Sequence, residues 1–321
     1  MTTRHLVDPE LVALLDQVSD SVLTAETLRQ TRALVSQAPA NLPQFAALSV
    51  SERFIPGPEG APDVRVLVYL PTSVQGTVPA LLWLHGGGYI MGSANGEDLA
   101  VKSMVSALGC AAVSVDYRLA PETPYPGAVE DGYAALKWLA THAGELGIDP
   151  KRIAVGGGSA GGGLAAALAL LARDRGEISL VFQCLLAPML DDRTCTLANP
   201  HPYTGEFIWT PQANRFGWTS LLGQEPGGPD VSPYAAAARA EHLEGLPATF
   251  LYVGTLDLFL EEDLEYARRL MRAGVPTELH VYPGAYHGFR MVANARVTQA
   301  AMRDQLAALQ RAFDVSRRSN D

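Results

Sequence analysis

Apolar, strand-like runs alternate with segments of helical periodicity over most of this chain. Strands that alternate with helices build a mostly parallel sheet whose two faces are covered by helices. Two earlier runs, at residues 47–57 and 63–71, are typical of antiparallel strands. The pattern therefore predicts an α/β fold with a mostly parallel central sheet. The six runs that we expect as its buried strands are residues 79–85, 111–117, 152–156, 180–187, 248–254 and 278–282.

The spacing of these runs also predicts how the chain is divided. Residues 1–45 carry helical patterning that ends in the breaker sequence APANLP, and we expect them to form N-terminal cap helices. The α/β domain would comprise residues 46–187 and 248–321. Between these parts, residues 188–247 far exceed the usual connection of about 2 to 6 residues. Insertions of this length are often lids, so we expect a cap insertion here.

The third buried run leads into a glycine-rich turn and then a helix, in the sequence RIAVGGGSAGGGLAAALALLA. Gly157, Ser159 and Gly161 match the pattern G-x-S-x-G of a nucleophile elbow. A sharp strand-to-helix turn strains the serine backbone, and its neighbours must lack side chains for the chain to pass so closely. The motif predicts a serine nucleophile at the start of a helix, although such a turn could also cradle a phosphate.

A second glycine cluster ends the run LLWLHGGGYI, where His85 is followed by three glycines. Glycines leave backbone N–H groups unobstructed, and an acyl-transfer site needs two or three such donors aimed at the developing oxyanion. We assign this role to the amides of Gly87, Gly88 and Ala160. A tight glycine turn is the alternative, as is a phosphate loop, but the G-K-[ST] sequence of the latter does not follow.

Two further polar residues each follow an expected strand. Asp257 comes after the run at 248–254, and His287 comes after the run at 278–282. The order Ser, Asp, His along the chain is that of α/β hydrolases, and catalytic groups of open α/β sheets lie where the strands end. We therefore predict that His287 is the general base and that Asp257 orients it.

Taken together, four motifs resemble the hormone-sensitive-lipase-like family of carboxylesterases, and most closely its heroin-esterase-like bacterial members. The resemblance spans roughly residues 60–290 and implies an α/β-hydrolase fold with a helical cap, a serine hydrolase with Ser159, Asp257 and His287 as triad, and no cofactor. The motifs are HGGG at 85–88, VDYRLAPETPYP at 115–126, GGSAGG at 157–162, and Asp257 with HGF at 287–289.

The chain departs from that family at two places. Gly158 stands before the nucleophile where the family often has Asp, which affects local hydrogen bonding and the acyl side of the pocket. The acidic pair usually found after the triad Asp appears as Glu261 and Glu262. With Asp263, these residues lie in a predicted helix, and we interpret them as a solvated first turn favoured by the helix dipole. The alternative is that one of the three orients His287 in place of Asp257.

Several aromatic residues are candidates for the substrate pocket. Ligand pockets are mostly apolar with a few polar groups, and a cap must cover something. Tyr89 follows the oxyanion glycines, Phe289 follows His287, and Phe207 and Trp209 lie in the insertion. Simple core packing is the alternative for each of them.

Two polar clusters are expected to be structural, with direct contact to the substrate as the alternative for each. Asp116, Arg118 and Glu122 are interpreted as buried support for the oxyanion loop. The residues Asp191, Asp192 and Arg193 are interpreted as loop ion pairs.

Composition and charge exclude several classes of function. The net charge of −10 disfavours nucleic acid and anionic membranes, so we expect small neutral molecules as partners. No run of about 20 apolar residues predicts a membrane span, and the first residues lack a secretory pattern, so we expect a cytoplasmic protein. The three cysteines, Cys110, Cys184 and Cys195, have no metal-binding spacing, and we expect no metal. The last helical segment, 298–313, could close the sheet or form a homodimer face.

These observations predict a serine carboxylesterase that hydrolyses short- to medium-chain esters through an acyl-enzyme intermediate. Amides, lactones or carbamates are alternative substrates, because the same residues would act on them. A protein of this fold that only binds a small molecule is a further alternative, which the presence of His287 disfavours.

Overall fold

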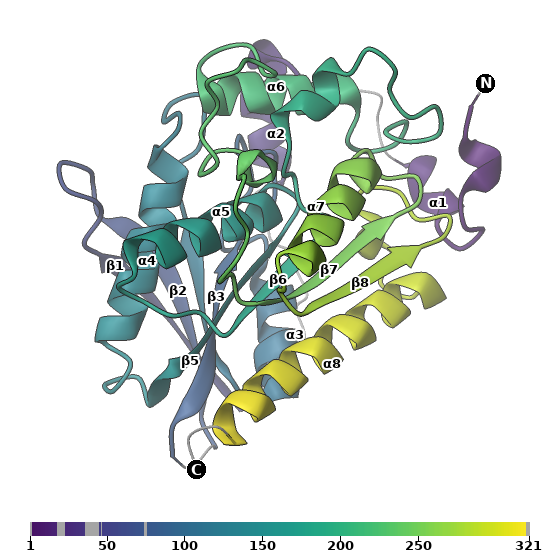
Figure 1. Ribbon diagram of the computed structural model, residues 1–321. Coiled ribbons are helices and arrows are strands. Elements are labelled where there is room, and N and C mark those ends of the chain that lie inside the picture. The colour runs from purple at the N-terminus through teal and green to yellow at the C-terminus, as the bar shows by residue number, and fades with distance from the viewer. Residues whose placement is uncertain (1, 18–22, 36–44, 46, 74–75, 319–321) are drawn as a thin grey trace.

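The computed structural model describes residues 2–17, 23–35, 45, 47–73 and 76–318, and these residues build one eight-stranded sheet with helices on both faces (Figure 1). The strand order is β1-β2-β4-β3-β5-β6-β7-β8. β2 pairs antiparallel with both β1 and β4, and all the other neighbours are parallel. The strands are β1 (Leu48–Ile55), β2 (Val64–Pro71), β3 (Val78–Leu84), β4 (Ala111–Asp116), β5 (Ile148–Gly158), β6 (Phe182–Leu186), β7 (Ala248–Gly254) and β8 (Thr277–Tyr282).

The α/β fold expected from the sequence is confirmed, and each expected strand is present within a few residues of its expected bounds. The largest difference is in β5, which begins at Ile148, whereas the apolar run predicts a start at residue 152. The earlier residues, Asp149 to Lys151, are polar, so hydrophobic patterning did not reveal them.

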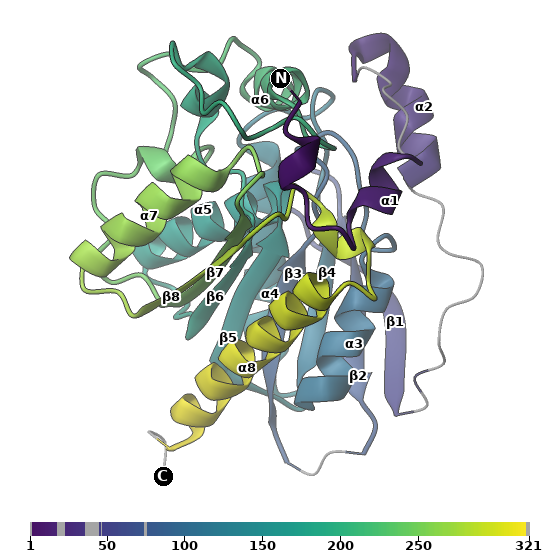
Figure 2. The ribbon, with the colours of Figure 1, turned by 90° about the vertical axis from the view of Figure 1, so that its right-hand side faces the viewer.

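Two groups of helices sandwich the sheet. Figure 1 shows α4, α5 and α7 in front of the sheet, and Figure 2 shows α3 and α8 across the other face. Successive side chains of a strand point to opposite faces of the sheet, so β3 contributes to the hydrophobic core on both faces. Leu82 and Leu84 belong to one core cluster, and Leu81 and Trp83 belong to the other. The helices are α1 (Val12–Leu15), α2 (Ala25–Val35), α3 (Asp98–Leu108), α4 (Gly127–Thr141), α5 (Ala160–Arg175), α6 (Pro211–Leu222), α7 (Leu260–Arg272) and α8 (Arg296–Arg318).

Helices α2 and α6 lie beyond the same end of the sheet in both views (Figures 1 and 2). Helix α2 comes from the expected N-terminal cap segment, of which residues 1, 18–22 and 36–44 are outside the described part. Helix α6 comes from the insertion at 188–247, which otherwise contains two short 3-10 turns, Asp192–Thr196 and Ala237–Arg239. Thr210 caps α6 by accepting a hydrogen bond from the Ala213 amide, and Gly223 ends it in a left-handed conformation.

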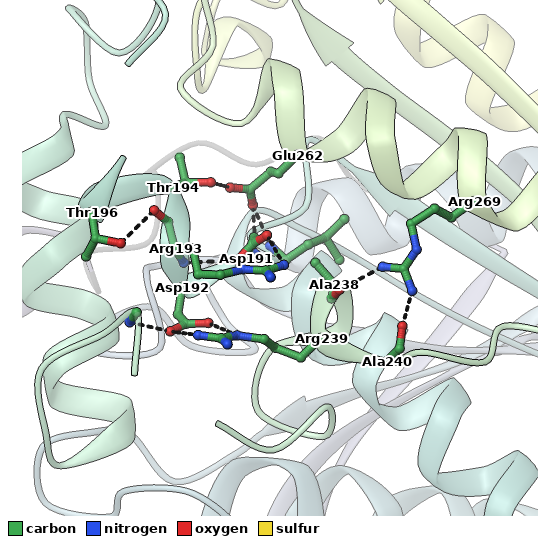
Figure 3. A network of polar contacts seen from close by, with 12 residues as sticks. Asp191, Asp192, Arg193, Thr194, Thr196, Ala238, Arg239, Ala240, Glu262 and Arg269 are labelled. Carbon is green, nitrogen blue, oxygen red and sulfur yellow. Dashed lines mark hydrogen bonds and ion pairs between the residues drawn. The ribbon is translucent and has the colours of Figure 1, made fainter. Parts of the chain in front are cut away.

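A polar network attaches both ends of the insertion to helix α7 (Figure 3). At its start, the Glu262 carboxyl group accepts hydrogen bonds from the amides of Leu190 and Asp191 at 2.7 and 3.1 Å, and from the Thr194 hydroxyl. At its end, the Arg269 guanidinium donates to the carbonyl oxygens of Ala238 and Ala240. The insertion is therefore held by one rigid element at both of its ends.

Within the insertion, Asp192 is fully buried and pairs with Arg239 through two hydrogen bonds of 2.8 and 2.9 Å (Figure 3). Asp191 pairs with Arg193 at the surface, as expected for a loop ion pair. The expectation of a solvated first turn in α7 was wrong for two of its three acids, because Glu262 is 7% exposed and Asp263 is fully buried. Helix dipole and charge pattern suggested solvent, whereas the insertion packs over this turn.

Candidate active site

Ser159 occupies a single residue between β5 and α5, and its backbone is strained. Its φ of 56° and ψ of −125° lie outside the regions that side-chain-bearing residues usually adopt. The two flanking glycines of the motif are sterically required. A Cβ atom at Gly157 would lie 2.4 Å from the carbonyl oxygen of Leu84, and one at Gly161 would lie 2.1 Å from the same atom. The turn thus holds the serine hydroxyl above the end of the sheet.

The fold brings Ser159, His287 and Asp257 into one hydrogen-bonded chain. The His287 Nε2 atom lies 2.9 Å from the Ser159 Oγ atom, and His287 Nδ1 lies 2.9 Å from Asp257 Oδ2. Asp257 is fully buried, and its other carboxylate oxygen accepts the Phe259 amide at 3.0 Å. Because an ionised carboxylate can only accept, Nδ1 carries the proton and Nε2 is left to accept from the serine.

The loop that follows β3 runs beside this serine. A Cβ atom at Gly86 would lie 3.5 Å from the Ser159 Cβ atom. Gly87, Gly88 and Tyr89 all have positive φ values, of 120°, 60° and 65°. Among the residues that the structure describes, no backbone acceptor pairs with the amides of Gly87, Gly88 or Ala160. These N–H groups are therefore free to bind an oxyanion, which is the arrangement that the sequence predicts.

His85, which begins the glycine loop, is held in place by Tyr117. Its ring stacks on Tyr117 with 4.1 Å between centroids, and Tyr117 donates to the His85 carbonyl oxygen at 2.7 Å. Burial lowers the pKa of His85, so the ring is neutral near pH 7.

A cavity of about 550 Å³ opens from Ser159 and His287 toward helices α3 and α8. Phe289 lines it, as we expected for a substrate-binding residue. The rest of its wall is mainly apolar, with Leu99, Ala100, Met104, Leu186, Ala187, Met302 and Leu306. Its polar side chains are those of Asn95, Glu97, Ser103, Arg290 and Gln305.

The other three aromatic candidates lie around this cavity without lining it. Trp209 packs on Gly88 and lies 6.3 Å from the His287 ring between centroids. Tyr89 is 2% exposed, and its hydroxyl donates to the carbonyl oxygen of Met189. Phe207 packs edge-on against Tyr286. Trp209 is thus next to the catalytic histidine, Tyr89 is buried, and Phe207 is half-buried against the core, while their roles in substrate binding stay predictions.

Comparison with known proteins places the chain in a family. Residues 81–291 match the model of a family described as having the alpha/beta hydrolase fold. The chain belongs to this α/β-hydrolase family. It is 36% identical over 316 residues to carboxylesterase NlhH of Mycobacterium tuberculosis, with 96% of each chain covered.

Solved structures agree with this placement of the α/β hydrolase. A bacterial heroin esterase has 42% sequence identity and a TM-score of 0.90, with 97% of this chain and 99% of that chain covered. Esterase LipW from Mycobacterium marinum has 35% identity and a TM-score of 0.78, with 97% of both chains covered. The resemblance drawn from the four motifs is confirmed, and with it the class of carboxylic ester hydrolases.

The polar residues of the VDYRLAPETPYP motif do not form the single buried cluster that we expected in this α/β hydrolase. Asp116 is partly buried, accepts the Ala94 amide at 2.6 Å and pairs with Arg65. Arg118 pairs with the fully buried Asp131. The Glu122 side chain is 63% exposed, so the expectation of burial was wrong there. Asp116, Arg118 and Glu122 therefore each bind a different partner: the Ala94 amide, Asp131 and Arg32.

Arg32 was missed by sequence reasoning. From α2 it donates to the Ile90 carbonyl oxygen at 2.6 Å and to the Ala120 carbonyl oxygen at 2.8 Å, and it forms a two-point ion pair with Glu122. It thus ties the N-terminal helix to the end of the glycine loop. No local pattern marks this arginine, because its partners are 58 or more residues away in the sequence.

Gly158, where the family often has Asp, differs from its glycine neighbours. A Cβ atom there would lie no closer than 3.8 Å to another atom, which is ordinary contact. Glycine is therefore not sterically required at this position of the α/β hydrolase, and its effect is to widen the cavity that it lines.

Neither a metal cluster nor a spanning helix is found in the described part of the chain. No group of three or more His, Cys, Asp or Glu residues is placed there to hold a metal ion. In the same residues, no helix is both long and apolar enough to cross a membrane.

Proposed function

We propose that this protein is a serine carboxylesterase that hydrolyses short- to medium-chain esters, with Ser159, His287 and Asp257 as its catalytic triad. The observation that carries the proposal is the hydrogen-bonded chain in which His287 lies 2.9 Å from both the Ser159 hydroxyl and the Asp257 carboxylate. Its place beside the free amides of Gly87, Gly88 and Ala160 supports acyl transfer.

In the first half of the reaction, His287 Nε2 takes the proton of Ser159 as the Oγ atom attacks the ester carbonyl carbon. The carbonyl oxygen becomes an oxyanion and is stabilised by the amides of Gly87, Gly88 and Ala160. The intermediate collapses, the bond to the alcohol oxygen breaks, and His287 gives its proton to that oxygen. The alcohol leaves, and an acyl-enzyme ester remains on Ser159.

In the second half, a water molecule repeats the attack on the acyl carbon, with His287 again as the base. The second oxyanion collapses with loss of the Ser159 oxygen, which regains its proton from His287, and the carboxylic acid is released. Asp257 keeps the imidazole in the correct tautomer throughout and stabilises its positive charge. No cofactor is needed for these steps, and the expected partner is a small ester in the cytoplasm.

The test is hydrolysis of p-nitrophenyl acetate, butyrate, octanoate and palmitate by the wild type and by Ser159→Ala. Ser49→Ala, an exposed serine on the edge strand β1, is the matched control. We expect activity on the shorter esters that falls by at least about 10⁴-fold in Ser159→Ala and is retained in Ser49→Ala. Hydrolysis of p-nitroanilides or lactones but of none of these esters would replace the ester proposal with one of those substrates. Equal turnover by Ser159→Ala and the wild type would overturn the assignment of the nucleophile.

A further inference from the structure

Arg290 is a partly buried cation that lines the catalytic cavity and has no ion-pair partner among the described residues. It lies in the short 3-10 turn Phe289–Met291, three residues after His287. Two other partly buried arginines pair with a buried carboxylate, Arg118 with Asp131 and Arg239 with Asp192. Arginine keeps its charge at any ordinary pH, so Arg290 places a permanent positive charge beside the reaction site.

Two neighbours explain how this charge is tolerated. Burial acts against the charged form of Arg290, but the Tyr252 hydroxyl and, at longer range, the Glu97 carboxylate favour it, and its pKa is raised. Glu97 is itself bonded to another group, since it accepts a hydrogen bond of 3.3 Å from the indole N–H of Trp83. The charge is balanced at a distance. Among the residues that the structure describes, the Tyr252 hydroxyl is the one side-chain group bonded to the guanidinium, which has five N–H donors.

The rest of the cavity wall restricts what could bind these donors. Leu99, Met104, Met302 and Leu306 present apolar surface between α3 and α8. The polar side chains of Asn95, Glu97, Ser103 and Gln305 also line the cavity. The amide of Gln305 donates to the Met104 sulfur, the Ser103 hydroxyl donates to the Leu99 carbonyl oxygen, and Glu97 accepts from the Trp83 indole, so these three are already engaged. A ligand that fits this wall has an apolar stem and ends in an oxygen acceptor. A carboxylate is the best match for a guanidinium fork, because it accepts two hydrogen bonds and carries the opposite charge.

We propose that Arg290 binds a carboxylate carried by the substrate, so that this enzyme prefers esters with a negatively charged group at the far end of the chain that enters the α3–α8 side of the cavity. This inference rests on the proposed esterase function and names its substrate class. It differs from the expectation of neutral substrates drawn from the net charge of −10. A long-range field of that sign is screened within about 8 Å at physiological salt, whereas Arg290 acts at contact distance.

The test compares pairs of substrates that differ only in whether a remote carboxylate is free or methylated. For the acyl side, the pair is p-nitrophenyl hydrogen glutarate and its methyl ester, and for the alcohol side it is 4-acetoxybenzoate and its methyl ester. For each pair, kcat/KM of the charged substrate is divided by that of the neutral one, in the wild type, Arg290→Met and Arg290→Lys, at 0.15 M salt. The intrinsic reactivity of each substrate cancels when the ratios of two enzymes are compared.

We expect the ratio for one of the two pairs to fall roughly ten- to hundredfold in Arg290→Met, mainly through KM, and to be partly retained in Arg290→Lys. The pair that responds identifies which part of the ester enters this side of the cavity. Arg303→Met is the control, because the Arg303 side chain is 73% exposed on α8, and its ratios should equal those of the wild type.

A ratio that is the same in the wild type and in both Arg290 variants, for both pairs, would overturn the proposal and leave Arg290 as a structural partner of Tyr252. If Arg290→Met does not fold, the same ratio of kcat/KM is measured in Arg290→Lys and in Glu97→Gln instead. Glu97→Gln should raise the ratio, because it removes a negative charge from the wall of the same cavity. Absence of hydrolysis of all four esters by the wild type would contradict the proposed function instead, so the two failures are distinguishable.

Discussion

The indole ring of Trp209 rests directly on Gly88. A Cβ atom at Gly88 would lie 2.1 Å from the Cη2 atom of Trp209. Trp209 comes from the insertion, where its Nε1 atom donates to the buried side chain of Asn214. The insertion therefore packs directly against the oxyanion loop at Gly88, and the two must be positioned together.

We expect Gly88→Ala to lower kcat by about 100-fold or more, because the added methyl group must displace either Trp209 or the loop amides. Gly109→Ala is the matched control. Both glycines have a φ of 60°, but nothing lies within 4 Å of a Cβ atom at Gly109. The control should lose about 1 kcal/mol of stability and keep its activity. Equal kcat values for the two variants would contradict the steric argument. Steady-state kinetics and thermal unfolding measure these effects.

The three glycines around Ser159 should respond differently to alanine. Gly157→Ala and Gly161→Ala place a methyl group within 2.4 Å of the Leu84 carbonyl oxygen. We expect these variants to lose most of their activity and several degrees in Tm. Gly158→Ala meets nothing closer than 3.8 Å and should retain wild-type stability. Severe destabilisation by Gly158→Ala would show that the space seen at this position is not available.

Arg32 should act as a positioning residue for the oxyanion loop. Its loss removes the hydrogen bonds to the carbonyl oxygens of Ile90 and Ala120. We expect Arg32→Met to lower kcat roughly tenfold, the effect of about 1 to 2 kcal/mol, with a smaller change in KM. Arg29→Met, on the same helix with an exposed side chain, is the control. A lower Tm with unaltered kcat would contradict this role and show that Arg32 only holds α2 against the rest of the protein.

Asp263 should make the protein less stable as the pH rises. It is fully buried, and neither carboxyl oxygen has a hydrogen-bond partner among the described residues. Burial, with smaller effects from Glu262 and Asp257, raises its pKa well above the usual range. The unfolded chain therefore releases this proton at a lower pH than the folded protein does. The free energy of unfolding then falls as the pH rises above about 4 toward the raised pKa.

We expect Asp263→Asn to flatten this dependence in urea unfolding measured at pH 5, 7 and 9. Glu265→Gln serves as the control, since Glu265 is half-exposed and its Arg268 partner lowers its pKa. The prediction fails if Asp263→Asn and the wild type lose stability in parallel between pH 5 and 9. Glu262 contributes in the same direction, because burial also raises its pKa.

Local sequence was sufficient for the strands and the nucleophile turn. β7 occupies the predicted residues, and the motif around Ser159 is sterically determined by the chain that carries it. Such features depend on neighbours within a few residues, so apolar runs and glycine spacing reveal them. The polar start of β5 escaped prediction, because its pairing with β3 is decided by a strand 70 residues earlier.

The order and types of Ser159, Asp257 and His287 could be read from the sequence, and with them the family. Which other side chains surround them was decided by the tertiary structure alone. The burial of Glu262 and Asp263, the contact of Trp209 with Gly88, the hydrogen bond from Arg32 to Ile90 and the position of Arg290 in the cavity wall each depend on segments far apart in the chain. Charge and periodicity describe a residue relative to its own helix or strand. Desolvation and contact depend on the element packed against it, and only the folded chain specifies that element.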